Sequence, residues 1–112
     1  MGFVLAAGRL DRKIAIERFG AVEDEHGDRV ESWAPLANVS AEVVPAPGGE
    51  RYSSSENAAT ALTRFTIRWS TTVADVNPKD RIGYGGRFYN IKSAIELGRR
   101  VGIEILAAVE TD

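Results

Sequence analysis

The fold class is decided by one segment, Arg64-Phe65-Thr66-Ile67-Arg68-Trp69-Ser70. Its apolar residues Phe65, Ile67 and Trp69 alternate without a break with polar ones. Successive side chains of a β-strand point to opposite faces, so a period of two that is rich in aromatic and β-branched residues predicts a half-buried strand. We therefore expect the three apolar side chains in a core and the polar ones on the opposite face.

Other segments repeat this pattern. Every odd position from Val101 to Val109 is apolar, which predicts a strand, although a helix is the alternative for its second half, which is rich in helix-forming residues. Weaker alternation predicts strands that contain Ile14 and Ile16, Val39 to Val43, Tyr89 to Leu97, and Val30 to Trp33. We expect Pro35 to end the last of these, because proline has no N–H to donate to a sheet.

Turn-forming residues separate these segments. Tyr84-Gly85-Gly86-Arg87 has two adjacent glycines, which suit a tight hairpin turn because such turns need positive φ. Polar turns are also expected at residues 24–28, 77–80 and 97–100. The predicted fold is all-β, a small barrel or sandwich of six or seven mostly antiparallel strands, in a single domain over residues 1–112.

Two segments fall outside the strand pattern. Residues 45–61 are rich in Pro, Gly, Ser and Ala, so we expect one long flexible loop there. Residues 1–8 are an apolar leader that is too short for a secretory signal and has no basic residue before it. No stretch approaches the roughly 20 apolar residues that cross a bilayer, so no membrane association is expected.

Composition excludes several classes of function. The 112 residues contain no cysteine, so disulfides and thiolate metal sites are excluded. The formal net charge is −2, whereas proteins that grip phosphates usually carry a basic excess. The composition is that of an ordinary globular protein, and we expect it to occur in the cytoplasm.

Residues suited to catalysis are few. The only histidine, His26, lies in an acidic turn, and no Gly-x-Ser-x-Gly pattern supports a role for Ser53, Ser54 or Ser55 as a nucleophile. The acidic residues around His26 lack the ligand spacing of a calcium loop, and the glycines at 83, 85 and 86 lack the Gly-Lys-Ser/Thr of a phosphate loop. We expect no catalytic, cofactor or metal site, and no enzyme.

Arginines on the predicted polar strand faces allow two interpretations. Small β-barrels bind single-stranded nucleic acid through aromatic residues in basic grooves, and Arg64, Arg68, Arg81 and Arg87 lie near Trp69 and Tyr89 in the sequence. Alternation, however, places Trp69 on the core face, and arginine is favoured at protein interfaces. We therefore predict that these four arginines contact other subunits or partners, and that Trp33 belongs to the core.

The order of these features resembles one family across residues 8–107, the phage head–tail joining proteins, also called head-closure or stopper proteins. The resemblance rests on a basic first strand at residues 9–18, an acidic-glycine turn followed by Trp33, and the strand at residues 39–43. It continues with Gly48-Gly49-Glu50, Phe65-Thr66-Ile67-Arg68-Trp69, and the segment from Arg81 to Ile91. Members also occur in prophages and gene transfer agents.

The resemblance implies a structural protein of the virion, assembled in the bacterial cytoplasm. It would form a homo-oligomeric ring between the portal or adaptor ring and the tail-terminator or tail proteins, closing the DNA-filled head and docking the tail. By the same resemblance, one loop would approach packaged double-stranded DNA in the channel without sequence preference, namely Gly48, Gly49, Glu50, Arg51, Tyr52, Ser53, Ser54, Ser55, Glu56 and Asn57. Another virion ring protein, resembling a tail terminator, and a barrel that binds single-stranded nucleic acid remain alternatives.

Overall fold

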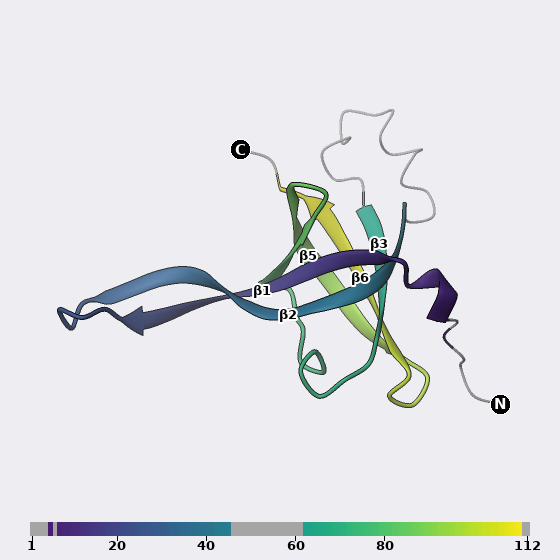
Figure 1. The fold of residues 1–112 in the computed structure, drawn as a ribbon, viewed down its shortest axis with the longest axis horizontal. Helices are drawn as coiled ribbons and strands as arrows, with labels where there is room; N and C mark the ends of the chain where they lie inside the picture. Colours follow the sequence, from purple (N-terminus) through teal and green to yellow (C-terminus); the bar gives the residue numbers. More distant parts are fainter. Residues whose placement is uncertain (1–4, 6, 46–61, 111–112) are drawn as a thin grey trace.

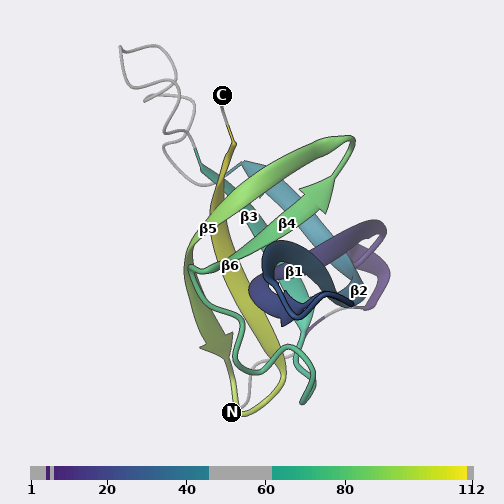
Figure 2. The same cartoon turned by 90° about the vertical axis from the view of Figure 1, so that its left-hand side faces the viewer.

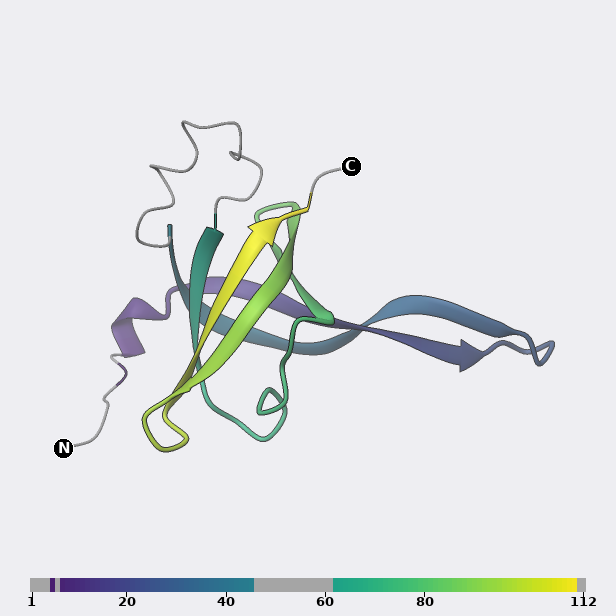
Figure 3. The ribbon, with the colours of Figure 1, turned by 180° about the vertical axis from the view of Figure 1, so that it is seen from behind.

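The described chain folds into six antiparallel strands. Figures 1 and 3 show the fold from opposite sides. The computed structural model describes residue 5 and residues 7–45 and 62–110. A 3-10 turn, η1 (Ala7–Arg9), precedes the strands, which are β1 (Arg12–Glu23), β2 (Arg29–Pro45), β3 (Leu62–Arg68), β4 (Asp80–Tyr84), β5 (Arg87–Leu97) and β6 (Gly102–Val109). The all-β prediction is confirmed, and the segment after Val101 is a strand rather than a helix.

The strands close into a barrel in the order β1-β2-β3-β6-β5-β4, with β4 pairing back onto β1 (Figure 2). Short turns join the paired strands β1 and β2, β4 and β5, and β5 and β6. Residues 69–79 instead lead from β3 to β4, which lies three positions away around the barrel. This connection contributes Val73 and Val76 to the core, so it packs against the interior of the barrel. Only its final polar turn was expected from the sequence.

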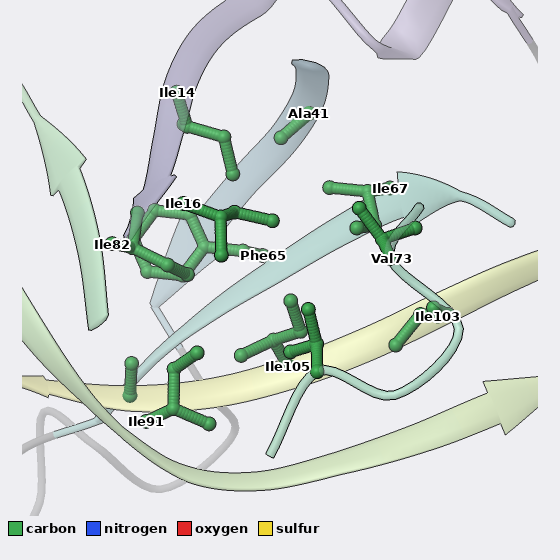
Figure 4. Close-up of a cluster of buried hydrophobic side chains, with 12 residues drawn as sticks. Ile14, Ile16, Ala41, Phe65, Ile67, Val73, Ile82, Ile91, Ile103 and Ile105 are labelled. Atoms are coloured by element: carbon green, nitrogen blue, oxygen red, sulfur yellow. The ribbon is translucent and has the colours of Figure 1, made fainter. Parts of the chain in front are cut away.

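Isoleucine side chains from several strands surround Phe65 in the barrel interior (Figure 4). Phe65 is fully buried, and its ring meets Tyr84 and Tyr89 edge-on, with ring centroids 6.1 Å and 5.1 Å apart. Ile67 is also fully buried, as the alternation in β3 predicted. Trp69 is half-buried and packs against the core from just beyond the end of β3.

A single long strand, β2, replaces the two strands predicted on either side of Pro35. The prediction that Pro35 ends a strand was wrong, because Pro35 lies at a β-bulge where Leu36 is the extra residue. Glu17 is opposite Pro35 and Ile16 is opposite Ala37. A bulge interrupts the hydrogen-bond ladder locally, so it tolerates the missing N–H of proline.

A second bulge lies in β5 at Lys92. The sequence predicted that apolar alternation continues through Lys92 to Ile95 and Leu97, but the extra residue reverses which side chains face inward. Ala94 therefore packs against the core, and Ile95 is 54% exposed. The length of the strand was predicted, and the facing of its second half was not.

The predicted turns are confirmed. Gly85 and Gly86 have φ of 62° and 79° between β4 and β5, the left-handed geometry that a two-residue hairpin turn requires. Residues 98–101 join β5 to β6, and Arg100 there adopts a positive φ of 58°. The predicted channel loop and most of the apolar leader lie outside the described residues.

Candidate functional site

A two-stranded arm projects from the barrel (Figure 1). β1 pairs with β4 only as far as Arg18, but it stays paired with β2 as far as Glu23. Residues 19–33, called the arm below, therefore extend beyond the barrel as a hairpin. A lone two-stranded ribbon is marginally stable in water, so contacts at its root must hold it in place.

Ionic contacts hold one face of the root. The Arg18 guanidinium donates to both carboxylate oxygens of Asp80, from Nε at 2.9 Å and from Nη2 at 3.0 Å. It also donates to Asp75, from Nη1 at 3.1 Å. These hydrogen bonds to the carboxylates of Asp80 and Asp75 raise the pKa of Arg18, and the guanidinium lowers the pKa of Asp75. Arg18 therefore ties the arm to the connection between β3 and β4.

Asp80 is the most buried charged residue of the described chain, with a side chain that is 0% exposed. Besides Arg18, its Oδ2 atom accepts a hydrogen bond from the backbone N–H of Asn77 at 3.1 Å. A buried carboxylate needs such partners, because an unpaired charge in the interior is strongly destabilising. Asp80 thus joins the polar turn that precedes β4 to the root of the arm.

Aromatic stacking holds the other face of the root. The Arg81 guanidinium lies between the rings of Trp33 and Phe88, at 4.2 Å and 3.7 Å from the two centroids. Its Nε atom donates to Glu17 at 2.7 Å. Trp33 in turn contacts Phe19, with centroids 5.3 Å apart. This stack joins the arm to β4 and β5, so the arm is held on both faces and has a fixed direction.

The stack corrects the prediction for Trp33. Trp33 is half-buried and lies outside the core cluster, because its position opposite Phe19 is on the outward face of the arm. Glu17, Arg18, Asp75 and Asp80 were not predicted to have a role. No local pattern distinguishes them from ordinary surface charges, since their partners are 57 to 64 residues away in sequence.

The arm itself combines exposed apolar side chains with acidic ones. Val22 and Val30 are opposite each other and are 62% and 42% exposed. The arm has one basic residue, Arg29, and five acidic residues, which are Glu23, Asp24, Glu25, Asp28 and Glu31. At the tip, the Asp24 carboxylate accepts hydrogen bonds from the backbone N–H groups of His26 and Asp28, and these bonds close the turn.

The other end of the β1–β2 ribbon has the opposite charge. A hollow of about 260 Å³ lies there, lined by Leu10, Val39, Ser40, Arg68, Trp69 and Ser70. Lys13 donates to Ser40 beside it, and the Arg100 guanidinium lies 5.2 Å from the Trp69 ring centroid. Six exposed basic residues lie at this end, which is called the basic end below. They come from η1, the start of β1, the end of β3 and the turn between β5 and β6, and are Arg9, Arg12, Lys13, Arg68, Arg99 and Arg100.

The four predicted interface arginines do not form one patch. Arg64 and Arg68 lie on β3, and Arg81 lies on β4, which is diametrically opposite β3 in the order of the barrel. Arg68 and Arg87 are exposed and Arg64 is half-buried. Arg81 is occupied within the subunit by Glu17 and the two aromatic rings.

Little in the described residues suggests catalysis or metal binding. His26 is exposed in the turn of the arm, and Ser53, Ser54 and Ser55 lie outside the described residues. No group of three or more His, Asp or Glu side chains within residues 7–45 and 62–110 is placed to hold a metal ion. In the same residues no helix is long and apolar enough to cross a membrane.

Comparisons with known proteins agree with the resemblance seen in the sequence. The solution structure of protein SF1141 from Shigella flexneri 2a is 26% identical, with a TM-score of 0.71 over 96% of this chain and 99% of that one. A chain in the virion of a native gene transfer agent particle shares the fold, at 23% identity and a TM-score of 0.60 over 91% and 96% of the two chains. A search of curated proteins gives no match. The sequence model of the phage head completion proteins matches residues 5–110, so the chain belongs to this family, whose members are structural virion proteins rather than enzymes.

Proposed function

We propose that this chain forms a ring between the portal or adaptor ring and the tail, where it closes the DNA-filled head and docks the tail. The observation that carries the proposal is the braced arm. The exposed apolar side chains of the arm do not stabilise an isolated domain, whereas a projecting surface of fixed direction is suited to contact with other subunits. The family match and the fold shared with a chain of a gene transfer agent virion support the same context.

Arg64, Arg68 and Arg87 are the arginines that we propose to contact neighbouring subunits or partners. Arg68 and Arg87 are exposed, at the end of β3 and the start of β5. Arg81 has a different part in this proposal. It is already paired and stacked, so it would act on assembly by holding Trp33 and hence the arm.

The loop from Gly48 to Asn57 is proposed to face the channel. β2 ends and β3 begins side by side, with Pro45 opposite Thr63, so the connection between them leaves and returns at one rim of the barrel. The loop carries Glu50 and Glu56 but only one base, Arg51. Such a segment would neutralise few phosphates, which suits a conduit that retains DNA and later releases it.

Electron microscopy of particles from a strain that lacks this gene tests the proposal. Heads that lose DNA and remain separate from finished tails are expected. Normal tailed particles would refute head closure. Complementation with a chain lacking Gly48 to Asn57 should restore joined particles that retain DNA poorly, and full DNA retention would exclude a role for the loop.

Substitution of Arg68 separates an interface role from a folding role. Because Arg68 is exposed, Arg68→Glu should leave the melting temperature of the purified subunit within about 2 °C of wild type. The same change should lower the amount of the protein in particles. Wild-type incorporation of Arg68→Glu would rule out the proposed interface role, and Lys79→Glu, at an exposed turn, is a matched control.

A further inference from the structure

We propose that the arm of one subunit docks onto the hollow at the basic end of the next subunit, so that a second copy of this chain is the arm's partner. The inference rests on the proposed ring and specifies its contact. A closed ring of identical subunits with head-to-tail contacts needs two different, complementary surfaces on each chain. The arm and the basic end meet this requirement.

Charge is the first complementary property. The arm carries five acidic residues against Arg29, whereas the basic end carries six exposed bases, of which Arg68 lines the hollow. Two acidic residues reduce the charge of the basic end. Asp11 lies 3.8 Å from Arg12, and Glu96 accepts the backbone N–H of Arg100. The end remains basic, so an acidic arm would be attracted to it and a second basic end would be repelled.

Apolar surface is the second complementary property. Val22 and Val30 stand side by side and exposed on one face of the arm. The hollow offers Leu10, Val39 and the ring of Trp69 between polar rim residues. An apolar centre surrounded by charges is the usual anatomy of a protein interface. The two valines fit the centre, and the acidic residues at the tip of the arm, Glu25 and Asp28, would then face Arg68 and Arg100 at the rim.

Geometry prevents an arm from reaching the hollow of its own subunit. Val30 and Val39 belong to the same strand, and nine residues of extended chain separate them by about 30 Å. Arg18 and Arg81 hold the root of the arm on its two faces, so the arm does not fold back. An arm that occupies a hollow must therefore belong to another molecule.

Disulfide trapping in particles tests this contact, since the natural chain has no cysteine. The double variant V30C/S70C places one thiol on the arm and one in the hollow. Oxidised particles are expected to show a ladder of disulfide-linked multimers of this chain in non-reducing electrophoresis. Each single variant, and the control V30C/I95C with its second thiol on exposed β5, should show no such ladder.

Charge exchange gives an independent measurement in the same variant. Asp28 lies two residues from Val30 and is exposed, so Asp28→Arg should weaken the ladder at least threefold. Adding Arg68→Glu should restore the ladder, because the reversed pair attracts again. If V30C/S70C is present in particles but gives no ladder, the inference is overturned and the proposed ring stays intact. Disulfides that join the arm to a different virion protein would have the same meaning. Absence of the wild-type chain from particles would overturn the proposed function, and the inference with it.

Discussion

Removal of the Asp80 carboxylate should destabilise the protein more than removal of any other acidic side chain in the described residues. In Asp80→Ala, Arg18 loses two hydrogen bonds and the backbone N–H of Asn77 loses its acceptor. Breaking a buried ion pair usually costs about 3–5 kcal/mol. Arg18 is 36% exposed and can still turn to water, which reduces its share, so we expect a loss of about 3 kcal/mol.

Urea unfolding followed by tryptophan fluorescence measures this loss. For a domain of this size, about 3 kcal/mol corresponds to a fall in melting temperature of roughly 15 °C. Asp80→Asn keeps one acceptor oxygen and should lie between Asp80→Ala and wild type. Asp75→Ala is the matched control, because it removes the exposed partner of the same guanidinium. Equal losses for Asp80→Ala and Asp75→Ala, or an unchanged midpoint for Asp80→Ala, would refute the argument from burial.

Three further changes test other parts of the structure. Phe65→Ala should cost about 3–5 kcal/mol in urea unfolding because Phe65 is fully buried, whereas half-buried Trp69→Ala should cost about 2 kcal/mol; equal losses would contradict this difference in burial. Arg81→Met should lower the free energy of unfolding by about 1–2 kcal/mol. In a Trp69→Phe background, where Trp33 is the only tryptophan, the same change should shift the emission to the red, and unchanged emission would mean that Arg81 does not hold the arm. Wild type should exceed Asp75→Asn in stability at pH 7, and the difference should be lost only as the pH falls below 3.8, the ordinary pKa of an aspartate, because the pKa of Asp75 is lowered. A difference that has already vanished at pH 3.8 would contradict the lowered pKa.

Local periodicity predicted the strands whose pairing is regular. In β3, strict alternation correctly placed Phe65 and Ile67 inside. The glycine pair at residues 85 and 86 correctly located a hairpin, because positive φ is a local requirement. These features depend on neighbours in the sequence, which is why they could be predicted without a structure.

Bulges defeated the prediction where one extra residue changed the facing of a strand. Pro35 correctly indicated an interruption of the ladder but not that β2 continues past it, because continuation depends on pairing with β1. At Lys92 the bulge turned Ile95 outward, although its sequence pattern matched the core. Bulges are specified by the partner strand, so alternation within one strand cannot reveal them.

The candidate site could be predicted only in part. Exposed Arg68 was predicted correctly as a polar-face residue, but its place beside a hollow depends on Leu10, which precedes β1, and on Val39 of β2. The arm was missed because its existence follows from where β4 stops pairing with β1, after Arg18. The alternation within a strand predicts its length, but it does not predict how many strands pair with each part of it.

The net charge of −2 conceals an uneven distribution that bears on function. Residues 19–33 carry five acids and one base, a sum of −4, so the remainder of the chain carries +2. The small total therefore excludes neither a basic surface nor an acidic one; it only makes the two nearly cancel. In a head-to-tail ring this cancellation occurs at every contact, since each acidic arm would meet a basic end. The near-neutral composition is thus compatible with the proposed head-to-tail contact, because it can arise from two surfaces of opposite charge.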